Sequence, residues 1–197
     1  NNQIFYSFFF IKLSLQLYLN LAYKVYLKQK VLTMKFISYK HNSKPKFGIL
    51  NNNLITDLTS KISGADTLKD LISKNGISEA KTYASANPGN LSVDDIEYLP
   101  LIPNPGKIIC VGLNYSEHVK ETNRTVEENP VIFHRFPESQ TAHMQPIQRP
   151  IASDNLDFEG EMAVIMGEAG KHVKPEDALK HIVGYSCYNE STIRDWQ

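Results

Sequence analysis

Two carboxylates at strand spacing carry the strongest chemical signal in this sequence. The segment DFEGE (residues 157–161) leads directly into the apolar run at residues 162–166. Side chains alternate along a strand, so Glu159 and Glu161 would point the same way, roughly 6.5–7 Å apart. Neighbouring carboxylates repel each other, and a divalent cation such as Mg²⁺, Mn²⁺ or Ca²⁺ relieves that repulsion. An exposed acidic strand end with no ligand is the alternative interpretation.

His118 and Glu121, in the segment HVKE, form a second candidate. Positions i and i+3 share one face of a helix, so Glu121 could orient His118 as a general base. A solvated helix turn with an ordinary histidine has the same spacing, and the spacing alone favours that interpretation.

A third candidate follows the apolar run at residues 185–188. Glu190 follows that run after Asn189, and Arg194 and Gln197 lie about one turn further on. Together they could complete a metal site and bind an anionic substrate, because a guanidinium matches the geometry of a carboxylate. A polar loop with a solvated arginine is the alternative. The weaker candidates, none with metal-ligand spacing, are His134, Arg135, His143 and His172.

The elements that must position these residues fall into two parts. Residues 34–100 predict a small N-terminal domain in which a β-meander precedes a helix. The helix begins near Thr67 and is ended by Asn75-Gly76 as a left-handed cap. Prolines at residues 98–103 predict a linker, with the domain boundary near residue 100. The expected strands of the meander are residues 35–39, 47–50 and 54–58.

Residues 101–197 alternate between strand and helix signals, and the candidate residues lie where those elements begin or end. Almost continuous apolar runs predict strands that are buried on both faces. Pro175 marks the first position of a helix that Gly184 is expected to stop. The expected elements are strands at 107–112, 162–167 and 185–188, and helices that begin near residues 116 and 175.

Composition and charge exclude several classes of protein. Hydrophobic residues make up 42% and charged residues 21% of the chain, as in an ordinary soluble globular protein. Lys+Arg and Asp+Glu both number 21, so no net field attracts nucleic acid and the expected partners are small molecules or copies of the chain. Cys110 and Cys187 are far apart inside apolar runs, which predicts two buried free thiols in the cytoplasm or a mitochondrial matrix.

Residues 1–33 differ in character from the rest of the sequence. They are rich in Phe, Leu, Tyr, Lys and Asn, and residues such as Lys12 and Lys24 interrupt the roughly 20 apolar residues that a membrane span needs. A signal-peptide pattern is not clear either. Because the first methionine is Met34, we expect translation to begin there and residues 1–33 to be an upstream leader. A membrane anchor or targeting segment is the alternative.

Taken together, the second part of the sequence resembles the fumarylacetoacetate hydrolase family. The resemblance rests on the ordered segments KIICVGLNYSEHVKE, PVIFHRFPESQ, LDFEGEMAVIMG and GYSCYNESTIRDWQ, which span residues 107–197. It implies a β-rich α+β fold, in which a mixed β-roll catalytic domain follows a small N-terminal domain. Family members continue well beyond the position of Gln197, so we expect residues 101–197 to be the first part of that catalytic domain.

The resemblance also implies roles for the candidate residues. Glu159, Glu161 and Glu190 match the positions that hold Mg²⁺, Mn²⁺ or Ca²⁺, although many members have Asp where this chain has Glu190. His118, with Glu121, matches the residue that activates water. Positions that contact substrate oxygens are matched by Arg194 and Gln197.

The implied reaction is metal-dependent hydrolysis of a C–C bond in a 2-oxo acid or 1,3-diketo acid. Isomerisation and decarboxylation use the same metal platform in the family and stay open, and the complete protein is expected to be a homodimer. We expect a chain that stops inside the catalytic domain to be inactive. The alternative to an enzyme is a non-catalytic or membrane-tethered remnant. Neither a nucleic acid nor a membrane is an expected partner.

Overall fold

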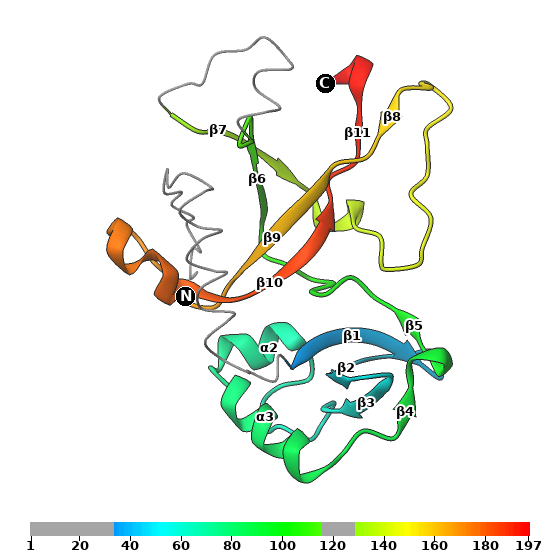
Figure 1. Cartoon of the computed structure of the whole chain (residues 1–197), viewed down its shortest axis with the longest axis vertical. Helices are drawn as coiled ribbons and strands as arrows, with labels where there is room; N and C mark the ends of the chain where they lie inside the picture. The colour runs from blue at the N-terminus through cyan, green and yellow to red at the C-terminus, as the bar shows by residue number, and fades with distance from the viewer. Residues whose placement is uncertain (1–33, 116–128) are drawn as a thin grey trace.

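The computed structural model describes residues 34–115 and 129–197, and it is rich in β-structure with few helices. Figure 1 shows a sheet with two helices as one part of the molecule, and long curved strand pairs as the other. The curved pairs form the half-barrel expected of a mixed β-roll. The α+β, β-rich fold class predicted from the sequence is therefore confirmed.

A five-stranded antiparallel sheet organises the first part, in the order β4-β3-β2-β1-β5. The first two strands form a hairpin whose turn residues, Asn42 and Ser43, both have positive φ. Asn and Ser at these positions supply the turn chemistry that the hairpin needs. The three strands of the expected meander are confirmed. The bounds are β1 Lys35–His41, β2 Lys44–Asn51, β3 Leu54–Asp57, β4 Leu91–Ser92 and β5 Glu97–Tyr98.

Two short helices cover this sheet, α2 (Leu68–Ser73) and α3 (Ile77–Ala86). The side chain of Thr67 caps α2 in a capping box with Asp70, and the left-handed Asn75 follows the helix, as predicted. Helix α3 was not among the predicted elements, and Ala80 is its only buried residue. No helix in the described residues is long and apolar enough to cross a membrane.

The hydrophobic core of the molecule sits between this sheet and its helices. Phe47 and Ile49 of β2 pack there with Leu58 and with Leu71 of α2, and these side chains are at most 2% exposed. Ile165 from the second part packs against the same cluster. Strand β9 therefore contacts the core of the first part through Ile165.

Three antiparallel strand pairs make up the second part: β6 with β7, β9 with β10, and β8 with β11. The pair β8–β11 continues the pair β9–β10 after an interruption, because residues 158–159 and 190–191 separate the two ladders. Figure 1 shows β6 and β7 beside this long ribbon. The bounds are β6 Ile108–Gly112, β7 Val131–Arg135, β8 Leu156–Asp157, β9 Gly160–Met166, β10 Ile182–Asn189 and β11 Thr192–Ile193.

The structure corrects the burial that the sequence predicts for two strands and two cysteines in this part. The strands β6 and β9 are present, but β6 is only half-buried, and alternate residues of β9 such as Met162 are exposed. Each has a single partner strand among the described residues, so neither is covered as a central strand would be. Cys187, on β10, is exposed and Cys110, on β6, is only partly buried, so the predicted burial of the two thiols is wrong, although both cysteines are free as expected.

The predicted helix at Pro175 is a short 3₁₀ helix that ends at His181, and Gly184 does not stop it. Gly184 lies inside β10, at a register shift in the pairing with β9. A glycine inside a strand often marks such an irregularity. Two further 3₁₀ turns occur in this part, at Pro137–Ser139 and Arg194–Trp196, and one in the first part, at Val93–Asp95.

Between residues 99 and 107 the chain has no regular helix or strand. The hydroxyl of Ser38 on β1 donates to the carbonyl of Leu101 at 2.7 Å, which ties this segment to the first sheet. From the other side, Gln140 Nε2 donates to the carbonyl of Ile102 at 3.3 Å. Both parts of the chain are thus hydrogen-bonded to residues 99–107. The domain boundary near residue 100 stays a prediction.

Candidate active site

The candidate site lies at the interruption between the two ladders of the long ribbon. A backbone hydrogen bond from Glu190 N–H to the carbonyl of Glu159, 2.9 Å long, crosses the interruption. The side-chain oxygen of Asn189 accepts from Glu159 N–H at 3.0 Å. Tyr188 is paired with Glu161 one step further along the ribbon. These pairings bring three glutamates from two chain segments to one place.

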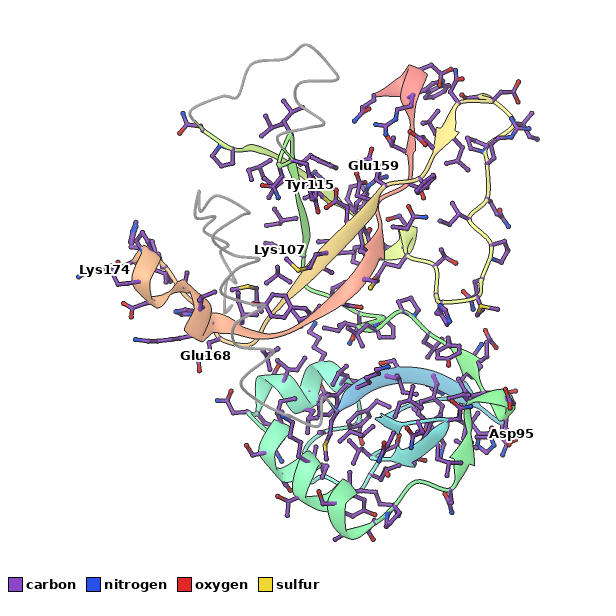
Figure 2. The ribbon with its side chains drawn as sticks, viewed as in Figure 1. Asp95, Lys107, Tyr115, Glu159, Glu168 and Lys174 are labelled. Atoms are coloured by element: carbon purple, nitrogen blue, oxygen red, sulfur yellow. The ribbon has the colours of Figure 1, made fainter. Side chains whose placement is uncertain are left out.

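Glu159 and Glu161 are oriented as strand alternation predicts. Both are partly buried, whereas Phe158, Gly160 and Met162 between and beside them are exposed. The two carboxylates therefore point to the covered side of the ribbon, towards β6 and β7. Figure 2 shows Glu159 and Tyr115 at the same end of β9, with Glu168 at the opposite end.

Glu190 is the most buried carboxylate of the site, at 6% exposure. Arg135, the last residue of β7, forms an ion pair with it through Nε and Nη2, and Nη2 also donates to the carbonyl of Ser191 at 2.7 Å. Burial raises the pKa of Glu190, and Glu159 and Glu161 add to this effect, whereas Arg135 opposes it. The three carboxylates are thus close enough to repel one another.

Arg194 joins the two ladders from its position after β11. Its Nε and Nη2 contact Asp157 Oδ2 at 2.9 and 2.8 Å. Its Nη1 contacts Glu159 Oε1 at 2.7 Å and donates to Gln197 Oε1 at 3.1 Å. The guanidinium of Arg194 holds the pKa of Asp157 below its usual value. Of the predicted substrate-binding residues, Arg194 and Gln197 are therefore in contact with each other and beside Glu159.

Glu161 is bonded to a residue of the motif that follows β6. The phenol of Tyr115 donates to Glu161 Oε2 at 3.0 Å. Burial raises the pKa of Tyr115, and this hydrogen bond adds to the effect. The hydroxyl therefore stays protonated at neutral pH and serves as a donor to the carboxylate.

The C-terminal domain model of the fumarylacetoacetate hydrolase family matches residues 107–197, which include every strand of this site. Residues 107–197 of this chain are therefore similar to the C-terminal domain of the fumarylacetoacetate hydrolase family. The family resemblance read from the motifs is confirmed. The match covers β6 to β11 and the three glutamates that meet at the interruption of the ribbon.

Two curated relatives in this family are similar over the same region. Oxaloacetate tautomerase fahd2, mitochondrial, of Xenopus laevis is 40% identical over 63% of this chain and 39% of its own length. Oxaloacetate tautomerase FAHD2A, mitochondrial, of Homo sapiens is 35% identical over 61% of this chain and 38% of its own length. The chain thus spans about two fifths of the length of these relatives.

Solved structures share the fold over most of the chain. The fumarylacetoacetate hydrolase of Exiguobacterium antarcticum has a TM-score of 0.69 and 30% identity, over 84% of this chain and 58% of that one. Maleylpyruvate hydrolase of Sphingobium sp. SYK-6, solved with manganese(II) and pyruvate, has a TM-score of 0.64. It is 20% identical over 80% of this chain and 60% of that one, and this likeness concerns the fold alone.

The chemistry of the donor set fits a hard divalent cation, because three carboxylates that repel one another are the usual ligands of Mg²⁺, Mn²⁺ and Ca²⁺. The side chains now have other partners: Glu159 contacts Arg194, Glu190 contacts Arg135 and Glu161 contacts Tyr115. Within residues 34–115 and 129–197, no three His, Cys, Asp or Glu side chains are grouped to hold an ion. Cation binding would require at least Glu159 to exchange its present partner.

The predicted catalytic pair, His118 and Glu121, lies outside the described residues. Tyr115, Arg135 and Asp157 are the contacts that sequence reasoning did not place in the site. The sequence indicates Arg135 only as one of the weaker candidates. The available signal for Asp157 was an acidic residue two positions before the E-x-E pair, because a partly buried arginine needs such partners.

The thiol pKa of Cys110, on β6, depends on its burial and on the charges of this site. Burial raises the pKa of its thiol to about 11, with Glu190 as the next contribution and smaller ones from Glu161 and Glu159. The thiolate is the reacting form, so at pH 8 we expect iodoacetamide to modify Cys110 about 200-fold more slowly than an ordinary thiol of pKa about 8.5. The rate should rise about tenfold per pH unit until the pH approaches this pKa.

Mass spectrometry of the two cysteine peptides after timed alkylation measures both rates in one sample. Exposed Cys187 is the internal control and should be modified first. Equal rates for the two cysteines at pH 8 in the folded protein would contradict the burial and charge environment described for Cys110.

Proposed function

We propose that the protein containing this chain is a divalent-cation-dependent enzyme that forms the enolate of a short 2-oxo acid or 1,3-diketo acid. One observation carries the proposal: Glu159, Glu161 and Glu190 meet at the interruption of the ribbon with two arginines beside them. Carboxylates suit a hard cation, and guanidinium groups suit the carboxylate of an acidic substrate. The family match supports an enzyme of this kind.

The three glutamates would hold Mg²⁺ or Mn²⁺, with Ca²⁺ as a further possible ion. When bound, such a cation acts as a Lewis acid on the substrate carbonyl. Arg194 presents a planar guanidinium whose Nη1 already lies 2.7 Å from Glu159, so it can bind a substrate carboxylate next to the same place. Gln197, bonded to Arg194, would contact a carbonyl or carboxylate oxygen of the substrate.

His118 and Glu121 would supply the proton transfer. A histidine is protonated and deprotonated near neutral pH, and Glu121, three positions later in the sequence, would orient it. His118 would remove a proton from the carbon next to the substrate carbonyl, or from a water that attacks the carbonyl. Tyr115 would keep Glu161 in place through its 3.0 Å hydrogen bond.

Three reactions pass through such an enolate, and we place tautomerisation first. The relatives from Xenopus laevis and Homo sapiens, 40% and 35% identical, are oxaloacetate tautomerases, which favours a keto–enol exchange of a 2-oxo diacid. Hydrolysis of a C–C bond, the reaction predicted from the motifs, is the second candidate and is favoured by the likeness to a fumarylacetoacetate hydrolase. Decarboxylation would use the same residues.

Removal of the cation tests this proposal. We expect EDTA to abolish the turnover of oxaloacetate and of an acylpyruvate by the full-length protein, and Mn²⁺ or Mg²⁺ to restore it, because the cation stabilises the enolate. Loss of the enol absorbance without new products indicates tautomerisation, whereas release of a carboxylic acid indicates hydrolysis. Turnover of either substrate that survives complete removal of metal would contradict the proposal.

Location and assembly belong to the same proposal. Both curated relatives are named as mitochondrial, which favours a mitochondrial matrix over the cytoplasm for this enzyme. A homodimer remains the proposed assembly of the complete protein, and light scattering on that protein would test it.

A further inference from the structure

We infer that Arg135 is a positioning residue that fixes the Glu190 carboxylate by one oxygen and leaves the other directed to the cation. This inference rests on the proposed function, because it assigns Arg135 a task in the proposed metal site. No motif or comparison described above gives Arg135 a role.

The contacts of Arg135 are concentrated on one carboxylate oxygen. Both Nε and Nη2 contact Glu190 Oε1, and Nη2 also donates to the Ser191 carbonyl at 2.7 Å. Three contacts to two consecutive residues fix the guanidinium plane relative to the end of β10. The Glu190 side chain therefore cannot rotate without breaking its ion pair with Arg135.

The surroundings make this ion pair costly to lose. The side chain of Glu190 is only 7% exposed and that of Arg135 30%. A buried carboxylate needs a partner that both neutralises it and donates hydrogen bonds. The arginine comes from β7, whereas Glu190 follows β10, so the pair also joins two strand pairs of the half-barrel.

Partners behind a ligating carboxylate commonly set its orientation and its affinity for the metal. With Oε1 held by Arg135, Oε2 is the oxygen of Glu190 that can face Glu159 and Glu161. A lysine would neutralise the same charge, but its compact ammonium lacks the planar fork that contacts Glu190 and Ser191 together. Substitution of Arg135 by Lys keeps the charge and changes the geometry, whereas substitution by Met removes both.

The experiment measures Mn²⁺ binding to the full-length protein by electron paramagnetic resonance, which reports free Mn²⁺ independently of turnover. We expect Arg135→Met to weaken Mn²⁺ binding about 10- to 100-fold, as loss of such partners commonly does. Arg135→Lys should recover only part of that loss. Arg149→Met is the matched control and should leave the affinity unchanged, because Arg149 pairs with Asp154, whose side chain is 93% exposed.

A double substitution separates positioning from simple support of the fold. If Arg135 acts through Glu190, Arg135→Met should weaken Mn²⁺ binding much less in a Glu190→Gln background than in the parent. Equal losses in both backgrounds, or unchanged affinity in the folded Arg135→Met and Arg135→Lys variants, would overturn the inference and leave the proposed function standing. A parent protein that does not bind Mn²⁺ would overturn both.

Discussion

Replacing Glu159 with Gln is expected to lower the cation-dependent turnover of a 2-oxo acid by about 1,000-fold. The amide keeps the size of the side chain but removes the negative charge that would bind the cation. Lewis-acid stabilisation by a bound metal is worth several kcal/mol, and about 4 kcal/mol corresponds to a 1,000-fold change in rate. Glu159 also contacts Arg194. The substitution therefore removes the carboxylate that both the cation and the Arg194 guanidinium would contact.

Steady-state kinetics with varied Mn²⁺ concentration measure this effect. Glu168→Gln is the control, since Glu168 lies exposed just beyond the opposite end of β9 (Figure 2) and should keep the parent rate. If folded Glu159→Gln retained parent turnover at the same Mn²⁺ concentration, Glu159 would not be a ligand and the proposed metal site would be wrong.

Local patterns in the sequence located the strands and the carboxylates well. Strand alternation placed Glu159 and Glu161 on one side of the chain, and the structure agrees because both are partly buried between exposed neighbours. The capping residue Thr67 and the left-handed Asn75 also marked the two ends of α2. Such features are decided by residues within a few positions of one another.

Contacts between distant segments were not predictable in the same way. Arg135 meets Glu190 across 55 positions, and this depends on how β7 lies relative to β10. No local pattern distinguishes that arginine from one in solvent. Burial was misjudged for a related reason: apolar composition indicated covered strands at Met162 and Val164, but both side chains are exposed on the ribbon.

The second large effect concerns Arg194, for which we expect Arg194→Met to reduce kcat/KM for an acidic substrate about 100-fold. Truncation of one partner in a hydrogen-bonded charge pair costs about 2–5 kcal/mol, and the lower part of that range applies because the Arg194 side chain is 34% exposed. Arg194→Lys should recover little, because an ammonium cannot contact Asp157, Glu159 and Gln197 as a planar guanidinium does.

Asp157 gives this prediction a readout that does not depend on the reaction. Arg194 holds the pKa of Asp157 below its usual value, so in Arg194→Met that pKa should rise towards the value of a free aspartate. A group with a lowered pKa favours the folded state above its usual pKa, and that contribution disappears as the pH falls through the lowered value. Carboxyl chemical shifts followed through an acid titration would measure the change, with Arg149→Met as the control.

The two measurements on Arg194 distinguish its possible roles. A raised Asp157 pKa with unchanged kcat/KM would mean that Arg194 only joins the two ladders, and its assignment to substrate binding would be wrong. A raised pKa together with a loss in kcat/KM that is larger for an acidic substrate than for its neutral ester would assign the guanidinium to the substrate carboxylate. Comparison with the neutral ester distinguishes substrate binding from structural support, because distortion of the ribbon would lower kcat/KM equally for the acid and the ester.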